Sequence, residues 1–157
     1  MNITLIQIGK TDASYIREGV ELYLKRINHY TKFDIVTIPD IKNARKLTRE
    51  QQKAEEGRLI LAQVADGDFL TLLDESGKQA RSVDFAAWMQ KRLNSGIRRL
   101  CFVIGGPYGF SPEVYARSNE MVSLSKMTFS HQLVRVIFAE QLYRAFTILN
   151  HEPYHHE

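Results

Sequence analysis

Two stretches in the C-terminal half of the chain combine small residues with groups that can bind a ligand. The first, residues 105–109, reads Gly-Gly-Pro-Tyr-Gly and follows the apolar run 100–104. The second, residues 123–131, reads Ser-Leu-Ser-Lys-Met-Thr-Phe-Ser-His and also starts in a strand-like run. In α/β proteins, loops at the carboxyl ends of parallel strands line the ligand crevice. We therefore expect the ligand site in the C-terminal half.

The glycine loop, residues 105–109, differs from the common phosphate-binding loops. Its glycine spacing is not that of a dinucleotide-binding loop, and it lacks the Lys-Ser or Lys-Thr pair of a P-loop. Pro107 also has no N–H to donate to a phosphate. A ligand without phosphate fits better, such as the nucleoside S-adenosylmethionine, whose adenine edge could contact the main chain of residues 124–129.

The elements that must position these loops alternate along a chain of 157 residues, which is the size of one domain, 1–157. Alternating strands and helices predict an α/β fold: a mainly parallel sheet with helices on both faces. The expected strands cover residues 1–8, 34–38, 69–73, 100–104 and 121–124, with a turn at 74–78. The expected helices run from residue 11 or 12 to 27, from the cationic residues near 42 to about 65, over 82–94, from 112, and over 131–149.

The last predicted helix, 131–149, is apolar around most of its circumference. Such a helix must be buried on more than one side. Two explanations stay open: a second copy of the chain covers it in a two-fold homodimer, or it is the central helix of a monomer. Its polar residues Glu140 and Arg144 have the spacing of a helical ion pair.

Cationic residues recur at intervals of three and four before and within the second predicted helix. They form what we call the basic stripe: Lys42, Arg45, Lys46, Arg49 and Lys53. On a helix this spacing places them along one face, as in a surface that binds a polyanion such as RNA. An ordinary solvated helix face has the same pattern. The net charge of +3 is small, so any attraction to RNA depends on this placement.

Other features limit the location and the cofactors of the protein. The N-terminus lacks the charged and long apolar segments of a signal peptide, and no apolar run is long enough to span a bilayer, which predicts a cytoplasmic protein. The single cysteine, Cys101, lies in an apolar run and is expected to be buried. Four histidines could form a zinc site, but no cysteine or carboxylate pair with structural-zinc spacing accompanies them, so we expect no metal. These histidines are His131, His151, His155 and His156.

Motifs in order along the chain carry a resemblance to a known family. They are Ile-Gly-Gly-Pro-Tyr-Gly at 104–109, residues 124–136, Glu-Gln-Leu-Tyr-Arg-Ala at 140–145, and Pro-Tyr-His-His-Glu at 153–157. Together they closely resemble the RlmH (YbeA) family of SPOUT-class methyltransferases. The resemblance implies a SPOUT fold with a C-terminal trefoil knot and S-adenosylmethionine as cofactor. It also implies methylation of N3 of a pseudouridine in 23S ribosomal RNA on assembled ribosomes, by a homodimer whose partner tail completes each site.

The resemblance also implies site residues. Cofactor contacts fall on Leu73, Gly105, Leu124, Ser125, Lys126, Met127, Thr128 and Phe129. The candidate catalytic residues are Arg144, Tyr154 and His155, and His155 is the candidate base because neutral imidazole is available near pH 7. Whether His155 acts as a base or only positions the nucleotide stays open. Many family members have an arginine where this chain has His156, and imidazole is a weaker phosphate anchor than guanidinium.

A second function class is a noncatalytic ribosome-binding or assembly factor. The basic stripe and a dimer would serve such a protein equally well. A pure binder, however, has no need for the glycine loop together with Arg144, Tyr154 and His155. The sequence therefore favours the methyltransferase.

Overall fold

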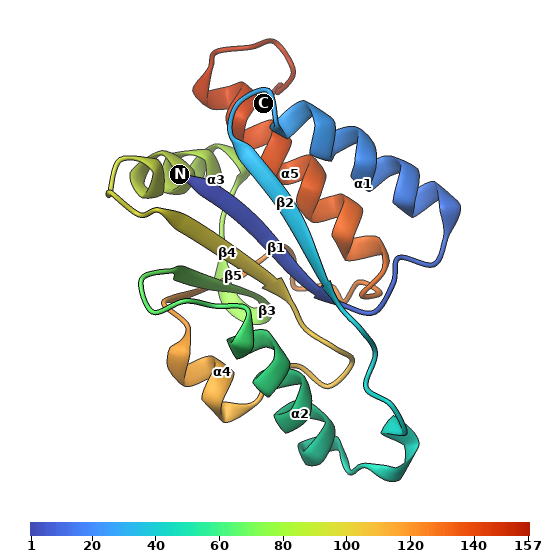
Figure 1. The fold of residues 1–157 in the computed structure, drawn as a ribbon. Helices are drawn as coiled ribbons and strands as arrows, with labels where there is room; N and C mark the ends of the chain where they lie inside the picture. Colours follow the sequence, from blue (N-terminus) through green and yellow to red (C-terminus); the bar gives the residue numbers. More distant parts are fainter.

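A computed structural model describes all residues 1–157 and contains a five-stranded, fully parallel sheet with the order β2-β1-β4-β3-β5 (Figure 1). The strands are β1 (Asn2–Ile8), β2 (Lys32–Ile38), β3 (Phe69–Gln79), β4 (Arg99–Ile104) and β5 (Glu120–Ser123). The helices are α1 (Ser14–Ile27), α2 (Arg49–Ala62), α3 (Ser82–Leu93), α4 (Pro112–Arg117) and α5 (Leu133–Leu149), with a short 3-10 helix η1 (Ala44–Lys46). The predicted α/β class is confirmed.

Helices cover both faces of the sheet, which explains why its central strands are continuously apolar. Successive side chains of a strand point to opposite faces. In β4, Phe102 packs with α3 and α5, whereas Cys101 and Val103 pack with α2 and α4. Cys101 is fully buried as a free thiol, as expected, and burial raises the pKa of its thiol to about 11. The thiol is therefore protonated at neutral pH and unsuited to nucleophilic attack.

Helix α5 lies between α1 and α3 on one face of the sheet (Figure 1). Phe138 and Leu142 are fully buried against the sheet. Gly19 of α1 allows the close approach of the two helices, because an added Cβ would lie 2.8 Å from Val136 Cγ2. Two flanking helices and the sheet thus account for much of the apolar circumference of α5 within a single chain.

Helix α1 begins later than the sequence indicates, and neither Thr11 nor Asp12 caps it. Its N-cap is Ala13, without a side-chain hydrogen bond. The two expected capping residues contact the segment around the start of α5 instead. The Thr11 hydroxyl accepts from Arg135 (2.9 Å), and the Asp12 N–H donates to Gln132 (2.9 Å). A long-range contact has replaced the local cap.

The basic stripe does not form one helical face, which corrects the expectation from its spacing. Helix α2 starts only at Arg49, where Thr48 forms a reciprocal capping box with Gln51. The Thr48 hydroxyl accepts from the Gln51 N–H (3.1 Å), and the Gln51 side chain accepts from the Thr48 N–H (2.9 Å). The three preceding cations lie in a turn and in η1.

The turn expected at residues 74–78 is also different in the structure, where β3 continues to Gln79. Leu73 and Lys78 both pair with Val122 of β5, so the residues between them form an irregularity in the strand. Gly77 fits there because it lies against β5, and an added Cβ would be 2.8 Å from main-chain atoms of Val122. Pairing with β5 therefore extends β3 and places Asp74 and Glu75 beside the loop that follows β5.

Candidate functional site

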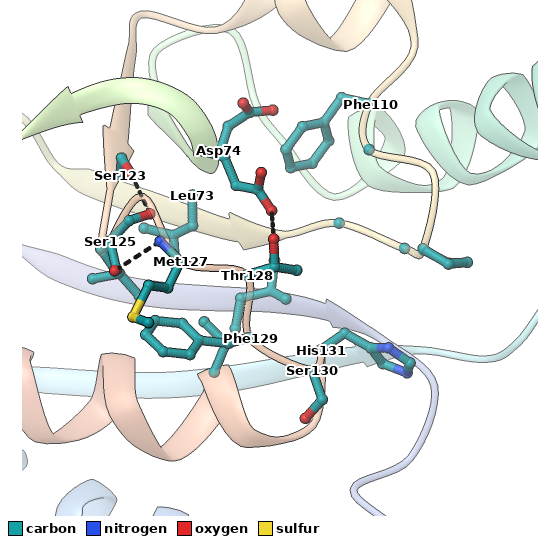
Figure 2. A pocket seen from close by; sticks show the side chains of 18 residues that line it. Leu73, Asp74, Phe110, Ser123, Ser125, Met127, Thr128, Phe129, Ser130 and His131 are labelled. Atoms are coloured by element: carbon teal, nitrogen blue, oxygen red, sulfur yellow. Dashed lines mark hydrogen bonds between the residues drawn. The ribbon is translucent and has the colours of Figure 1, made fainter.

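The carboxyl ends of β3, β4 and β5 surround a cavity of about 520 Å³ (Figure 2). The glycine loop forms one wall, and the segment 123–131, which we call the β5 loop, forms another. Both loops come from the C-terminal half, where the sequence places the site. Seven of the eight predicted cofactor residues line the cavity: Leu73, Gly105, Leu124, Ser125, Met127, Thr128 and Phe129.

Lys126 is the predicted cofactor residue that the structure does not place on the cavity wall. Its side chain is exposed, and it is absent from the lining. All other residues of the β5 loop line the cavity, and the sequence motif does not show which of its side chains turns away.

The glycine loop packs directly on a buried carboxyl group from α2. Glu56 is only 3% exposed, and burial raises the pKa of its carboxyl. Gly106 rests on it so closely that an added Cβ would lie 2.5 Å from Glu56 Oε2. Gly109, at φ +83°, has the left-handed conformation that glycine adopts most readily, and its N–H donates to the Gly106 carbonyl (3.2 Å). The loop therefore presents main-chain atoms to the cavity at two positions that require glycine.

Hydrogen bonds hold the β5 loop in place (Figure 2). The Ser123 hydroxyl donates to the Ser125 carbonyl (2.9 Å), and the Ser125 hydroxyl accepts from the Met127 N–H (3.0 Å). The Thr128 hydroxyl donates to Glu75 (2.9 Å), which ties the loop to the extension of β3. Met127 nevertheless remains 76% exposed, so the cavity is open on this side.

Arg135, the third residue of α5, anchors the far end of the β5 loop. Its guanidinium is almost fully buried and donates to the carbonyls of His131 (3.1 Å) and Ile8 (2.7 Å). A third bond goes to the Thr11 hydroxyl (2.9 Å). Arg135 thus connects the β5 loop to the end of β1, and His131 lines the cavity beside it.

Asp74 is a cavity residue that the sequence analysis missed. Its carboxylate accepts hydrogen bonds from the Tyr115 hydroxyl (2.5 Å) and from the Ser76 hydroxyl (2.5 Å) and N–H (2.8 Å). Burial alone would raise the pKa of Asp74, but these bonds outweigh it and lower the pKa below the ordinary value. Burial and the bond to Asp74 raise the pKa of Tyr115 to about 12. The Asp-Glu pair directly after the third strand was the available sequence signal, but it was interpreted as a turn.

The three candidate catalytic residues gather around Glu140 of α5 in what we call the tail cluster. Arg144 donates two bonds to Glu140 Oε1, from Nη2 at 2.5 Å and Nε at 3.0 Å. Its Nη1 lies 3.1 Å from Nδ1 of His155. The Tyr154 hydroxyl donates to Glu140 (3.1 Å), and the Tyr154 ring lies 4.8 Å from the Arg144 guanidinium. Burial, a hydrogen bond with Tyr23 and the charge of Glu140 raise the pKa of Tyr154.

Within one chain, the tail cluster and the cavity lie at opposite ends of α5. Val134 lines the cavity, whereas Arg144 lies ten residues further along the same helix. At 1.5 Å per residue this separates the two sites by ~15 Å. Figure 1 shows the C-terminus at the end of α5 far from the β5 loop. A single chain therefore does not bring its candidate catalytic residues to its own cavity.

The structure contains no group of three or more histidine, cysteine, aspartate and glutamate side chains arranged to hold a metal ion. His156 is exposed at the end of the chain.

None of the helices has both the length and the apolar character needed to cross a membrane.

A comparison with known protein families agrees with the parallel sheet and with a cavity formed by loops of the C-terminal half of the chain. The model of a family described as predicted SPOUT methyltransferase matches residues 1–155, so the chain belongs to the SPOUT methyltransferase family. Curated relatives extend the similarity over the whole chain. The ribosomal RNA large subunit methyltransferase H of Christiangramia forsetii is 56% identical over 156 residues, which is 99% of each chain. The proteins of the same name from Parabacteroides distasonis and Porphyromonas gingivalis (strain ATCC 33277) are 55% and 52% identical over 157 residues, all of each chain.

Proposed function

We propose that this protein is an S-adenosylmethionine-dependent methyltransferase acting on ribosomal RNA of the large subunit. The observation that carries the proposal is the cavity between the glycine loop and the β5 loop, in a chain similar over its full length to relatives named for that activity. The resemblance to the RlmH family adds the target atom, N3 of a pseudouridine in 23S ribosomal RNA, and the substrate, assembled ribosomes. Such an enzyme works in the cytoplasm, where ribosomes are. We also propose that the chain contains the trefoil knot of the family.

The cavity suits S-adenosylmethionine. Its volume of about 520 Å³ lies within the range of small-molecule sites. Phe110 and Phe129 provide apolar surface, and the glycine loop lets a flat group approach the main chain. The wall contains no lysine or arginine, so a phosphate group would find no cationic partner. When bound, S-adenosylmethionine supplies an electrophilic methyl group.

A second copy of the chain would bring the tail cluster to the cavity. The ~15 Å that separates Val134 from Arg144 along α5 supports this arrangement, because one chain cannot supply both parts of the site. In a two-fold dimer each cavity receives the tail cluster of the other chain. The proposed homodimer is therefore supported by the need to complete the site, more than by the apolar surface of α5.

The hydrogen-bond network supports a positioning role for His155. A guanidinium group only donates hydrogen bonds, so His155 Nδ1 accepts from Arg144 and the neutral ring carries its proton on Nε2. The free nitrogen of His155 is then a donor, which favours the positioning of the nucleotide over abstraction of its proton. Arg144 contributes a positive charge that stabilises the anion forming on the base as its N3 proton leaves to solvent water. Glu140 keeps Arg144 oriented through two hydrogen bonds.

The experiment that tests the proposal is transfer of labelled methyl groups from S-adenosylmethionine to assembled ribosomes, free large subunits and naked ribosomal RNA. The modified nucleotide is then mapped. We expect label on N3 of a pseudouridine, with the highest rate on assembled ribosomes. Binding of S-adenosylmethionine without label on any of the three substrates would contradict the proposal and support a noncatalytic ribosome-binding factor.

A further inference from the structure

The wall of the cofactor cavity is acidic in a protein that is basic as a whole. The chain has 21 lysine and arginine residues against 18 aspartate and glutamate residues. Yet Asp74 and Glu75 line the cavity, together with His131, and no lysine or arginine does. The cations in and beside the β5 loop are directed elsewhere: Arg135 is bound to carbonyls and a hydroxyl, and Lys126 is exposed.

Asp74 is a fixed negative charge in this wall. Three hydrogen bonds, two from Ser76 and one from Tyr115, hold its carboxylate in position. They also lower the pKa of Asp74 despite its partial burial, so the group is ionised at neutral pH. None of its hydrogen-bond partners is a cation, and its charge is therefore not neutralised within the protein. Glu75 is partnered by the uncharged Thr128 hydroxyl.

We propose that Asp74 makes the cavity distinguish the methyl donor from the demethylated product by charge. This inference rests on the proposed function. S-adenosylmethionine carries a positive sulfonium, whereas S-adenosylhomocysteine has a neutral thioether at the same position and is otherwise alike. A fixed carboxylate therefore stabilises the bound donor by one additional charge interaction. Across a cavity of this size, at an effective dielectric constant of about 20 to 40, that interaction corresponds to roughly tenfold in affinity.

The consequence is release of the product after each turnover. Loss of the methyl group removes the positive charge, so the same wall that attracts the donor holds the product less tightly. Tyr115 acts as a positioning residue in this arrangement, because it orients the Asp74 carboxylate without contributing charge. Asp74 is then a specificity-determining residue for the cofactor.

The test is calorimetric measurement of Kd for three probes with the wild-type dimer and with Asp74→Asn. The probes are S-adenosylmethionine, S-adenosylhomocysteine and sinefungin, in which a protonated amine replaces the sulfonium. We expect Asp74→Asn to weaken the two cationic probes roughly tenfold and the neutral product less than twofold. Asp74→Glu, which keeps the charge, should retain the preference for cations. Tyr115→Phe should reduce it by a smaller factor.

The outcomes separate the two proposals. An equal loss of affinity for all three probes, or an unchanged ratio of donor to product, would overturn the role of Asp74 and leave the proposed function in place. Failure of the wild-type protein to bind S-adenosylmethionine at all would overturn both. The melting temperature of unliganded Asp74→Asn verifies that the variant is folded before its Kd values are compared.

Discussion

The cofactor cavity and the tail cluster differ in how the chain builds them. The cavity is complete within one chain, because three parallel strands end at the same edge and their loops meet there. The tail cluster is also connected by hydrogen bonds, with Arg144 held by Glu140 and close to His155, but it lies at the opposite end of α5. In the proposed function, cofactor binding is thus a property of the single chain, whereas methyl transfer requires two.

This difference gives the two regions separate experimental signatures. Changes in the cavity should affect the affinity for S-adenosylmethionine first. Changes in the tail cluster should affect the rate of methyl transfer and leave that affinity nearly intact. Variants that affect both quantities equally would break the distinction.

The largest effect is expected from Arg144→Ala and His155→Ala. Removing a group that stabilises developing charge or orients the reacting base lowers the rate of methyl transfer by ~10²- to 10³-fold. The Kd for S-adenosylmethionine should change less than about twofold, since the wall of the cavity is formed within one chain by other residues. Single-turnover kinetics and calorimetry measure the two quantities, with the exposed Lys91→Ala as control. Equal losses in rate and affinity would remove the proposed catalytic role of the tail.

The next largest effect is expected from Gly106→Ala in the cavity. The added Cβ would lie 2.5 Å from Glu56 Oε2, so either the glycine loop or Glu56 must move. Overpacking of this kind costs ~1–3 kcal/mol, and we expect the affinity for S-adenosylmethionine to fall tenfold or more. Combining Gly106→Ala with Glu56→Ala should recover part of the loss, because the clash is relieved. An unaltered Kd for Gly106→Ala would show that the loop is not held on Glu56.

A third region, the basic stripe, sharpens the comparison because it should affect ribosome binding more than cofactor binding or chemistry. Arg49 stacks on Tyr108 of the glycine loop at 5.0 Å, so the stripe lies next to the cavity. Lys46→Glu combined with Arg49→Glu should weaken ribosome binding about tenfold and reduce its salt dependence. Filter binding at several salt concentrations measures this effect. Ribosome affinity equal to that of the wild-type protein would remove the stripe as a docking surface.

The smallest effect is a change in the pH dependence of stability on Glu56→Gln. Burial raises the pKa of Glu56 in the folded state, so the folded protein holds this proton more tightly than the unfolded chain does. Glu56 therefore reduces stability as the pH rises from the pKa that it has in the unfolded chain to the higher pKa that it has in the folded protein. Glu56→Gln removes this loss. We expect it to raise the melting temperature above that of the wild-type protein by more at pH 8 than at pH 5. If the melting temperatures of the two proteins change by the same amount between pH 5 and pH 8, a buried, ionising Glu56 would be contradicted.

Elements that are encoded locally could be predicted from the sequence. Strands β1 and β4 follow from their apolar runs, and α4 begins as expected at Ser111 and Pro112, with Ser111 as its N-cap. The start of α2 was also encoded locally, by Thr48 and Gln51, but the spacing of the basic stripe obscured it. The cavity was predictable because each of its main loops is continuous in the sequence.

Contacts between distant segments could not be predicted. Thr11 does not cap α1 because Arg135, far along the chain, binds its hydroxyl. Asp74 did not emerge as a cavity residue because the irregular pairing of β3 with β5 places it there. The distance between the tail cluster and the cavity depends on the direction of α5 in the fold, and motif spacing does not contain that information.

The most direct test of the account combines two inactive chains in one dimer. Gly106→Val, which fills the cavity, and His155→Ala, which disables the tail, are co-expressed with different tags, and dimers that contain one chain of each kind are purified. If each cavity uses the partner's tail, one site of the mixed dimer has both defects and the other has none. The account then predicts methyl transfer to ribosomes at about half the wild-type rate. A mixed dimer no more active than the two parent variants would contradict it.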